Sequence, residues 1–110
     1  MSETSKIAKA KSVLESVYDR AELVEKEAIP SMKFPIDEVL SNEEERKQRA
    51  RKIHRATSLG NLEKHKVSIV FEDVDGLKKA NTTIWAQTEK KIVLKGGNSI
   101  PVHRIWEVVI

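Results

Sequence analysis

Apolar and small residues near the start of the chain recur at alternating steps of three and four. Seven positions form this stripe: Ile7, Ala10, Leu14, Val17, Ala21, Val24 and Ala28. The period predicts an amphipathic helix over about residues 5–28, which ends before Pro30 because proline disfavours the helical conformation in the residue before it. Two roles stay open for this helix: docking on the rest of the chain, or pairing with another chain.

An extended linker and a second helix are predicted next, the helix over about residues 42–58. Ser41 and Glu44 have the spacing of a capping box, and Gly60 is expected to end the helix. Most of this helix is expected to face solvent, because its apolar positions are few: Ala50, Ile53 and Ala56. In the linker, three apolar residues alternate as anchoring side chains do: Met32, Phe34 and Ile36.

After Asn61 the hydrophobic period changes to two, which predicts β-strands. The expected strands cover residues 67–72, 78–88, 92–94 and two stretches of 99–110, the last two separated by a constriction at 101–104. Five short antiparallel strands in about 45 residues bury a common face by curling into a small barrel. The predicted fold class is α+β, with an N-terminal helical region over residues 1–62 and a five-stranded antiparallel, Sm-like or SH3-like β-barrel over residues 63–110.

The last strand is apolar at three consecutive positions, Val108, Val109 and Ile110, so both of its faces need cover. Natural proteins cover such an edge with a helix or with a partner strand. Either the first helix folds over it or two copies of the chain pair there. We expect a homo-oligomer through this C-terminal edge strand or through the first helix.

Composition describes one small domain, since the chain has 110 residues, 39% of them hydrophobic and 34% charged. It contains no cysteine, which excludes disulfides and thiol chemistry. No apolar run has the length of a signal peptide or a membrane span, so we expect a cytoplasmic protein without membrane contact.

Positive charge is concentrated in residues 46–66, which carry eight Lys or Arg residues against Glu63 alone. Such a run either binds phosphates or forms a solvated helix face that keeps the protein soluble, and both interpretations stay open. The candidate phosphate contacts are Arg51, Lys52, Arg55, Lys64 and Lys66. Aromatic rings would supply base stacking only where they face outward, and the candidates are Phe71, Trp85 and Trp106.

No set of residues indicates catalysis or metal binding. Catalysis needs a nucleophile beside an oriented base, and the histidines have no evident acidic partner in the sequence. The three histidines are scattered, so their spacing does not form a metal site. A calcium loop with Gly76 as its sixth-position glycine would place Phe71 at its first ligand position, and a turn is the better interpretation. We therefore expect no enzyme, no cofactor and no metal.

Two segments resemble the Sm-like family, in particular its bacterial RNA-chaperone class. Residues 84–95 (IWAQTEKKIVLK) look like the bent strand, turn and strand of that family, and residues 102–109 (VHRIWEVV) are similar in register to its lysine-histidine-alanine-isoleucine signature. The chain also looks like small bacterial proteins that end in a similar Ile-Pro-x-His-Arg-Ile segment, a likeness that carries no assigned activity.

The resemblance implies a helix followed by a five-stranded barrel, ring assembly and binding of uridine-rich or adenine-rich RNA. It places His103 on the family histidine and makes His103 and Arg104 candidate contacts to bases or backbone. The family's lysine and tyrosine positions hold Val102 and Pro101 here, and its alanine position holds Arg104.

Two functional hypotheses follow. The first is a non-enzymatic binding module that associates with single-stranded RNA through the basic helix and the edge of the barrel. The alternative is a protein-interaction or oligomeric scaffold domain, in which the basic run only confers solubility.

Overall fold

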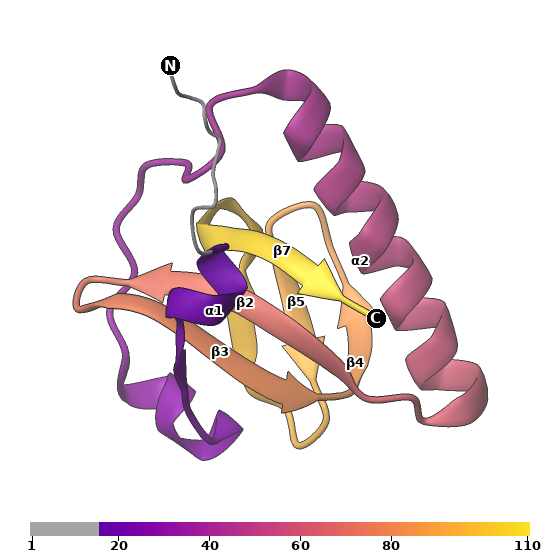
Figure 1. Cartoon of the computed structure of the whole chain (residues 1–110). Helices are drawn as coiled ribbons and strands as arrows, with labels where there is room; N and C mark the ends of the chain where they lie inside the picture. The colour runs from indigo at the N-terminus through magenta and orange to yellow at the C-terminus, as the bar shows by residue number, and fades with distance from the viewer. Residues whose placement is uncertain (1–15) are drawn as a thin grey trace.

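One long helix and two β-sheets make up residues 16–110, the part of the chain that the computed structural model describes (Figure 1). In chain order the elements are α1 (Val17–Arg20), β1 (Glu22–Leu23), the 3₁₀ helix η1 (Lys26–Ser31), α2 (Glu43–Glu63), β2 (Val67–Asp73), β3 (Gly76–Thr82), β4 (Ile84–Gln87), β5 (Lys91–Leu94), β6 (Ser99–Pro101), the 3₁₀ helix η2 (Val102–Arg104) and β7 (Ile105–Val109).

The two sheets have strand orders β1-β3-β2-β7 and β4-β5-β6. β2 and β3 form a regular hairpin that runs from the Val67–Thr82 pair to the Asp73–Gly76 pair. Gly76 closes the turn with a φ of 131°, a backbone conformation that side chains with a Cβ rarely adopt. The sequence period therefore located this hairpin and its turn correctly.

The prediction of a five-stranded antiparallel Sm-like or SH3-like barrel is wrong, because the described strands form two sheets that do not close. The expected long strand 78–88 is interrupted at Thr83, so that β3 pairs with β2 whereas β4 pairs with β5. The 3₁₀ turn η2 likewise separates β6 from β7. α2 packs against β4 of one sheet and β7 of the other, and thereby bridges the two sheets.

A single hydrophobic core lies between the sheets and α2. Its largest fully buried side chains include Ile69, Phe71, Ile84, Ile92, Leu94, Ile100 and Ile105. Ile53 and Ala56 of α2 and Ile29 of η1 belong to the same core. Val70 is also fully buried, so β2 is covered on both faces and not on one face as the alternation suggested.

The prediction of one helix over residues 5–28 is wrong across its described part. Residues 5–15 lie outside the described residues. From Ser16 the chain forms only the four-residue α1, then β1, then η1. β1 pairs in parallel with β3, and Val24 N–H donates to the carbonyl of Lys79 at 2.8 Å. These main-chain bonds to β3 replace those of a continuous helix.

The second helix is confirmed and is longer than predicted, since α2 spans 21 residues. Its N-cap is Asn42, not Ser41: the Asn42 side chain accepts from the Glu45 N–H at 3.1 Å. Gly60 does not end the helix, which stops at Lys64 in a left-handed conformation with φ of 55°. No helix in residues 16–110 is both long enough and apolar enough to cross a bilayer.

α2, and not the first helix, covers part of the free edge of β7. Arg49 Nη1 donates to the carbonyl of Ile105 at 2.9 Å, and Lys52 Nζ lies 3.5 Å from the carbonyl of Val108. The last two side chains, Val109 and Ile110, remain 40% and 39% exposed. The edge is therefore covered by the chain itself over its first part and open at its end.

Candidate nucleic-acid interface

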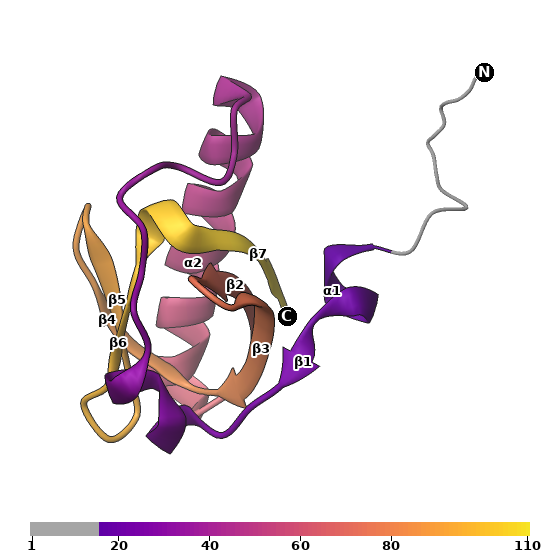
Figure 2. The same cartoon turned by 90° about the vertical axis from the view of Figure 1, so that its left-hand side faces the viewer.

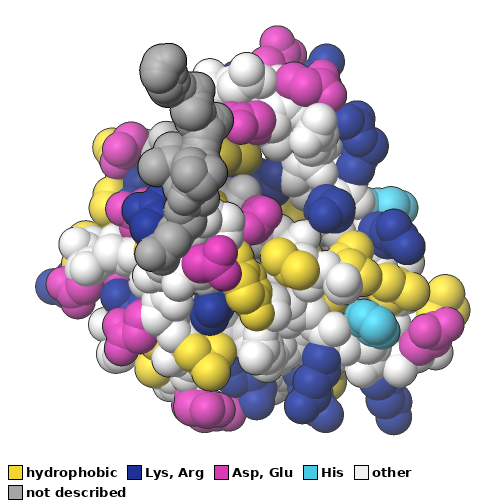
Figure 3. Space-filling view, viewed as in Figure 1, with side chains coloured by type: hydrophobic (Ala, Val, Ile, Leu, Met, Phe, Trp, Pro, Cys, Tyr) yellow, Lys and Arg dark blue, Asp and Glu magenta, His cyan; other side chains and the backbone are white. Residues whose placement is uncertain are grey.

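Three of the basic residues named above lie together on the outer face of α2. Arg51, Lys52 and Arg55 are exposed, and with Gln48 they line a hollow of about 260 Å³. Figure 3 shows Lys and Arg side chains gathered along this helix. Arg55 is four residues from Arg51 and three from Lys52, and residues three or four apart are neighbours on a helix surface.

The contacts of these cations with the protein are weak. Arg51 Nη2 lies 3.4 Å from Glu44 Oε2, in an ion pair whose side chains are 66% and 62% exposed. Exposed pairs of this kind contribute about 0–1 kcal/mol. A phosphate can therefore replace Glu44 beside Arg51 at little cost.

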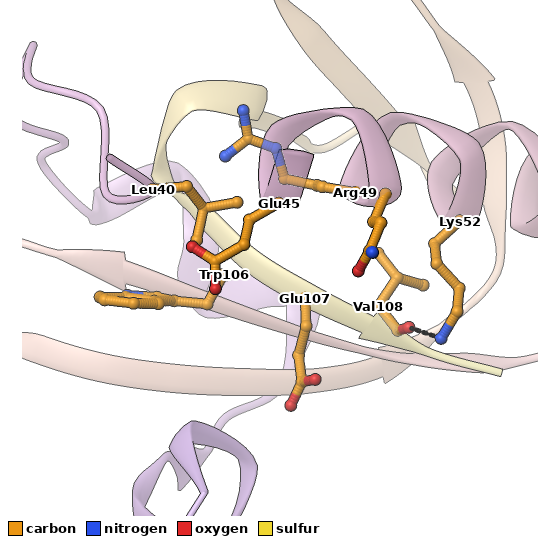
Figure 4. Close-up of a pocket in the computed structure, with 8 residues that line it drawn as sticks. Leu40, Glu45, Arg49, Lys52, Trp106, Glu107 and Val108 are labelled. Atoms are coloured by element: carbon orange, nitrogen blue, oxygen red, sulfur yellow. Dashed lines mark hydrogen bonds between the residues drawn. The ribbon is translucent and has the colours of Figure 1, made fainter. Parts of the chain in front are cut away.

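A groove between α2 and β7 limits the basic surface on one side (Figure 4). It has a volume of about 170 Å³, and its lining includes the carboxylates of Glu45 and Glu107 together with Trp106 and Lys52. Lys52 turns its ammonium group toward the carbonyl of Val108 at the edge of this groove. Arg49 also lines the groove but is bonded to Glu38, so Lys52 is the lining cation left to face the two carboxylates, and the candidate surface lies on the other side of Lys52.

Lys64 and Lys66 lie beyond the C-terminal end of α2, and both are exposed. Lys64 is the C-cap residue, and its N–H donates to the carbonyl of Gly60 at 3.0 Å. Lys66 lines a second hollow of about 240 Å³, whose lining also contains Lys26 and Lys95. Lys66 therefore belongs to a second basic hollow, which shares no lining residue with the hollow on the outer face of α2.

Trp85 is the most exposed of the three candidate rings. Phe71 is fully buried, and Trp106 donates its indole N–H to Glu72 at 2.8 Å. Trp85 is 47% exposed on β4. The sequence period left the orientation of these three rings undecided.

The strand that carries Trp85 approaches α2 at both of its ends. Gln87 Nε2 donates to His54 Nδ1 at 3.1 Å. At the other end of β4, a Cβ placed on Gly60 would stand 2.4 Å from the carbonyl oxygen of Ile84. Trp85 therefore lies on a strand that runs along the second half of the basic helix, as Figure 1 also shows.

His103 and Arg104 are not part of this surface. Arg104 is 5% exposed, and its guanidinium donates to the carbonyl of Glu72 at 3.0 Å and to that of Asp37 at 2.8 Å. His103 Nε2 donates to the carbonyl of Pro35 at 2.8 Å. Both side chains are occupied in holding the linker that precedes α2.

The buried Arg49–Glu38 pair was not identified from the sequence. Arg49 is 6% exposed, and its two terminal nitrogens bond the two carboxylate oxygens of Glu38 at 2.7 and 2.8 Å. Burial alone would raise the pKa of Glu38, but hydrogen bonds from Arg49 and from the Leu40 N–H outweigh it and hold the pKa below its ordinary value. Eleven residues separate the pair across an irregular linker, so no sequence period marks it.

Within the described part of the chain, no group of three or more His, Cys, Asp or Glu side chains is placed to hold a metal ion. His54 bonds an amide and His103 a backbone carbonyl, as given above.

Comparison with models of protein families, with curated proteins and with solved structures gives no match to this chain. The resemblance to the Sm-like family therefore stays a prediction that rests on residues 84–95 and 102–109.

Proposed function

We propose that this protein is a non-enzymatic module that binds single-stranded RNA through the outer face of α2 and the adjoining β4. The basic contacts are Arg51, Lys52 and Arg55 on the helix, and Lys64 and Lys66 extend them past its end. Cations at these positions replace the counterions of phosphates, which is the main source of affinity for a nucleic-acid backbone. The proposal assigns the module to the cytoplasm.

The observation that carries the proposal is the group of exposed cations on the outer face of α2, together with Trp85, which is 47% exposed on β4, a strand that packs against the same helix. Binding of single strands without sequence preference combines a cationic track with an aromatic ring on which a base stacks. Arg51 and Arg55 supply the first, and Trp85 supplies the second. The alternative in which the basic run only confers solubility gives no role to the exposed ring of Trp85.

The proposal leaves His103 and Arg104 out of the RNA site. Arg104 already satisfies two backbone carbonyls and would have to release them in order to bind a phosphate. Releasing them would leave buried acceptors without partners, which is costly. The RNA contacts are therefore expected from α2 and β4.

A rival function, protein interaction, is favoured by a different observation. Three apolar side chains near the ends of α2 and β7 are exposed: Leu62 at 82%, Val109 at 40% and Ile110 at 39%. Neighbouring exposed apolar side chains are common in protein contacts. This surface lies outside the set Arg51, Arg55 and Trp85, so the two functions are separable by mutation.

Fluorescence anisotropy with short uridine-rich and adenine-rich RNAs, at several salt concentrations, tests the proposal. If about three phosphates are neutralised, the log affinity falls with log salt at a slope of roughly −2. The Arg51→Glu/Arg55→Glu protein is expected to lose binding. The Arg20→Glu/Lys33→Glu protein changes the charge equally at two exposed positions away from α2 and is expected to keep most of it. Equal losses in both proteins, or no binding of the unaltered protein at low salt, would contradict the RNA proposal.

A further inference from the structure

The linker between η1 and α2 has no regular secondary structure, yet its backbone is held at several points. His103 Nε2 donates to the carbonyl of Pro35 at 2.8 Å, and Arg104 Nη1 donates to that of Asp37 at 2.8 Å. The Val39 N–H donates in turn to the carbonyl of His103 at 3.0 Å. The His-Arg pair of the Ile-Pro-Val-His-Arg-Ile segment therefore fixes the linker on both sides of Ile36.

Ile36 is 95% exposed, which is unusual for an isoleucine between two fixed neighbours. The other two expected anchors of the linker behave differently, since Met32 and Phe34 pack against the core. The stabilisation that burial gives an isoleucine is left unused in a single copy of the chain. Because the backbone around Ile36 is already ordered, its immobilisation on binding would cost little additional entropy.

A hollow of about 670 Å³ lies directly beside Ile36. Pro101 and Val102 contribute apolar surface to it, and the turn between β4 and β5 forms its other side with Glu89, Lys90 and Lys91. Figure 2 shows the linker and this turn on the same side of the molecule. Glu38, Arg49 and His103 also line the hollow, so it combines apolar surface with charged and polar side chains, as protein–protein contacts do.

We propose that this face is a contact between two copies of the chain related by a two-fold axis, with Ile36 of each copy seated in the hollow of the other. A two-fold contact uses one self-complementary patch, so a projecting side chain and its receptor must lie side by side on the same face. Ile36 and the hollow meet this condition.

The charges on the rim of the hollow also favour a second copy as the occupant. Glu89 stands next to Lys90 and Lys91, so the rim carries both signs of charge. A two-fold axis that passes between Glu89 and the two lysines sets the acid of one copy against the lysines of the other. A partner with one sign of charge would match only part of this rim.

Sedimentation of the full chain from micromolar to millimolar concentration tests the proposal. We expect a reversible dimer, and we expect Ile36→Asp to raise its dissociation constant by about tenfold or more. Because Ile36 is exposed, this substitution should leave the unfolding temperature of the single chain unchanged. Val74→Asp, at a position 57% exposed in the turn between β2 and β3 and outside the hollow, is the matched control and should leave dimerisation intact.

Two charge-reversed proteins test the two-fold arrangement itself. Glu89→Lys and Lys90→Glu/Lys91→Glu should each weaken self-association, and their mixture should restore it because opposite charges then meet across the contact. A protein that stays monomeric at millimolar concentration overturns the proposal. So does an Ile36→Asp protein that dimerises as the unaltered chain does, or a mixture that remains monomeric.

Discussion

Gly60 of α2 lies against the backbone of β4 at Ile84 with no room for a side chain. A Cβ on Gly60 would stand 2.4 Å from the Ile84 carbonyl oxygen and 2.9 Å from a methyl group of Thr83. This close approach brings the basic helix down onto the strand that carries Trp85. The proposed RNA surface therefore depends on a glycine that does not itself contact RNA.

Gly60→Ala is expected to destabilise the fold by about 1–3 kcal/mol, because the added methyl group forces α2 away from β4. In a helix with free space at this position, the same change would stabilise the protein by about 1 kcal/mol. The sign of the change in stability therefore shows whether Gly60 is in close contact with β4. Urea denaturation measures it. Ser58→Ala, at an exposed position of α2, is the control and should change stability by less than about 0.5 kcal/mol. A Gly60→Ala protein as stable as the unaltered one would contradict the close contact.

Glu38→Gln is expected to reduce the free energy of unfolding by about 2 kcal/mol at neutral pH, since it removes the carboxylate that Arg49 bonds through both terminal nitrogens. The folded state lowers the pKa of Glu38, so the ionised carboxylate contributes stability that is fully present above the ordinary value of about 4.3. That contribution is lost as the pH falls through the lower folded value.

The difference between the two proteins should therefore shrink as the pH falls below about 4.3, which denaturation at a series of pH values measures. Glu44→Gln is the matched control, because Glu44 belongs to an exposed pair with Arg51 and its loss should change stability far less. A difference between Glu38→Gln and the unaltered protein that stays constant down to acidic pH would disprove the stabilising role of the ionised pair.

Arg104→Lys separates a structural role from an RNA-binding role. The guanidinium reaches two carbonyls on different segments, Glu72 and Asp37, which the single ammonium group of lysine does not satisfy together. We expect a loss of about 1–3 kcal/mol of stability with unchanged RNA affinity. Thermal denaturation and anisotropy on the same sample measure both. If the Arg104→Lys protein kept its stability but bound RNA more weakly, Arg104 would be an RNA contact and not a structural residue.

Local sequence patterns predicted the elements in which the hydrophobic period is strong. They failed where contacts between distant parts of the chain determine the secondary structure. The capping region and charge pattern located α2, and alternation located the β2–β3 hairpin. The stripe from Val17 to Ala28 fits a helix equally well, yet this part of the chain bonds to the edge of β3. The interruption at Thr83, which separates the two sheets, has no signal in the alternation of residues 78–88.

The sequence predicted the charged residues of the candidate site but not their arrangement in space. The excess of Lys and Arg in residues 46–66 follows from the composition of that segment, and Arg51, Lys52 and Arg55 do share an exposed face. His103 and Arg104 were grouped with them through the resemblance, whereas the structure engages both with the linker. Alternation placed Trp85 on the face of its strand opposite Ile84, but it did not show whether that face is covered in the folded chain.

The most direct test of the account is the fluorescence of Trp85 during titration with single-stranded RNA, in a Trp106→Phe protein that leaves Trp85 as the only tryptophan. If a base stacks on Trp85 beside the basic helix, its emission is quenched on binding, and Arg51→Glu/Arg55→Glu in the same background abolishes the quenching. RNA binding that leaves Trp85 emission unchanged, or no binding at low salt, would contradict the account.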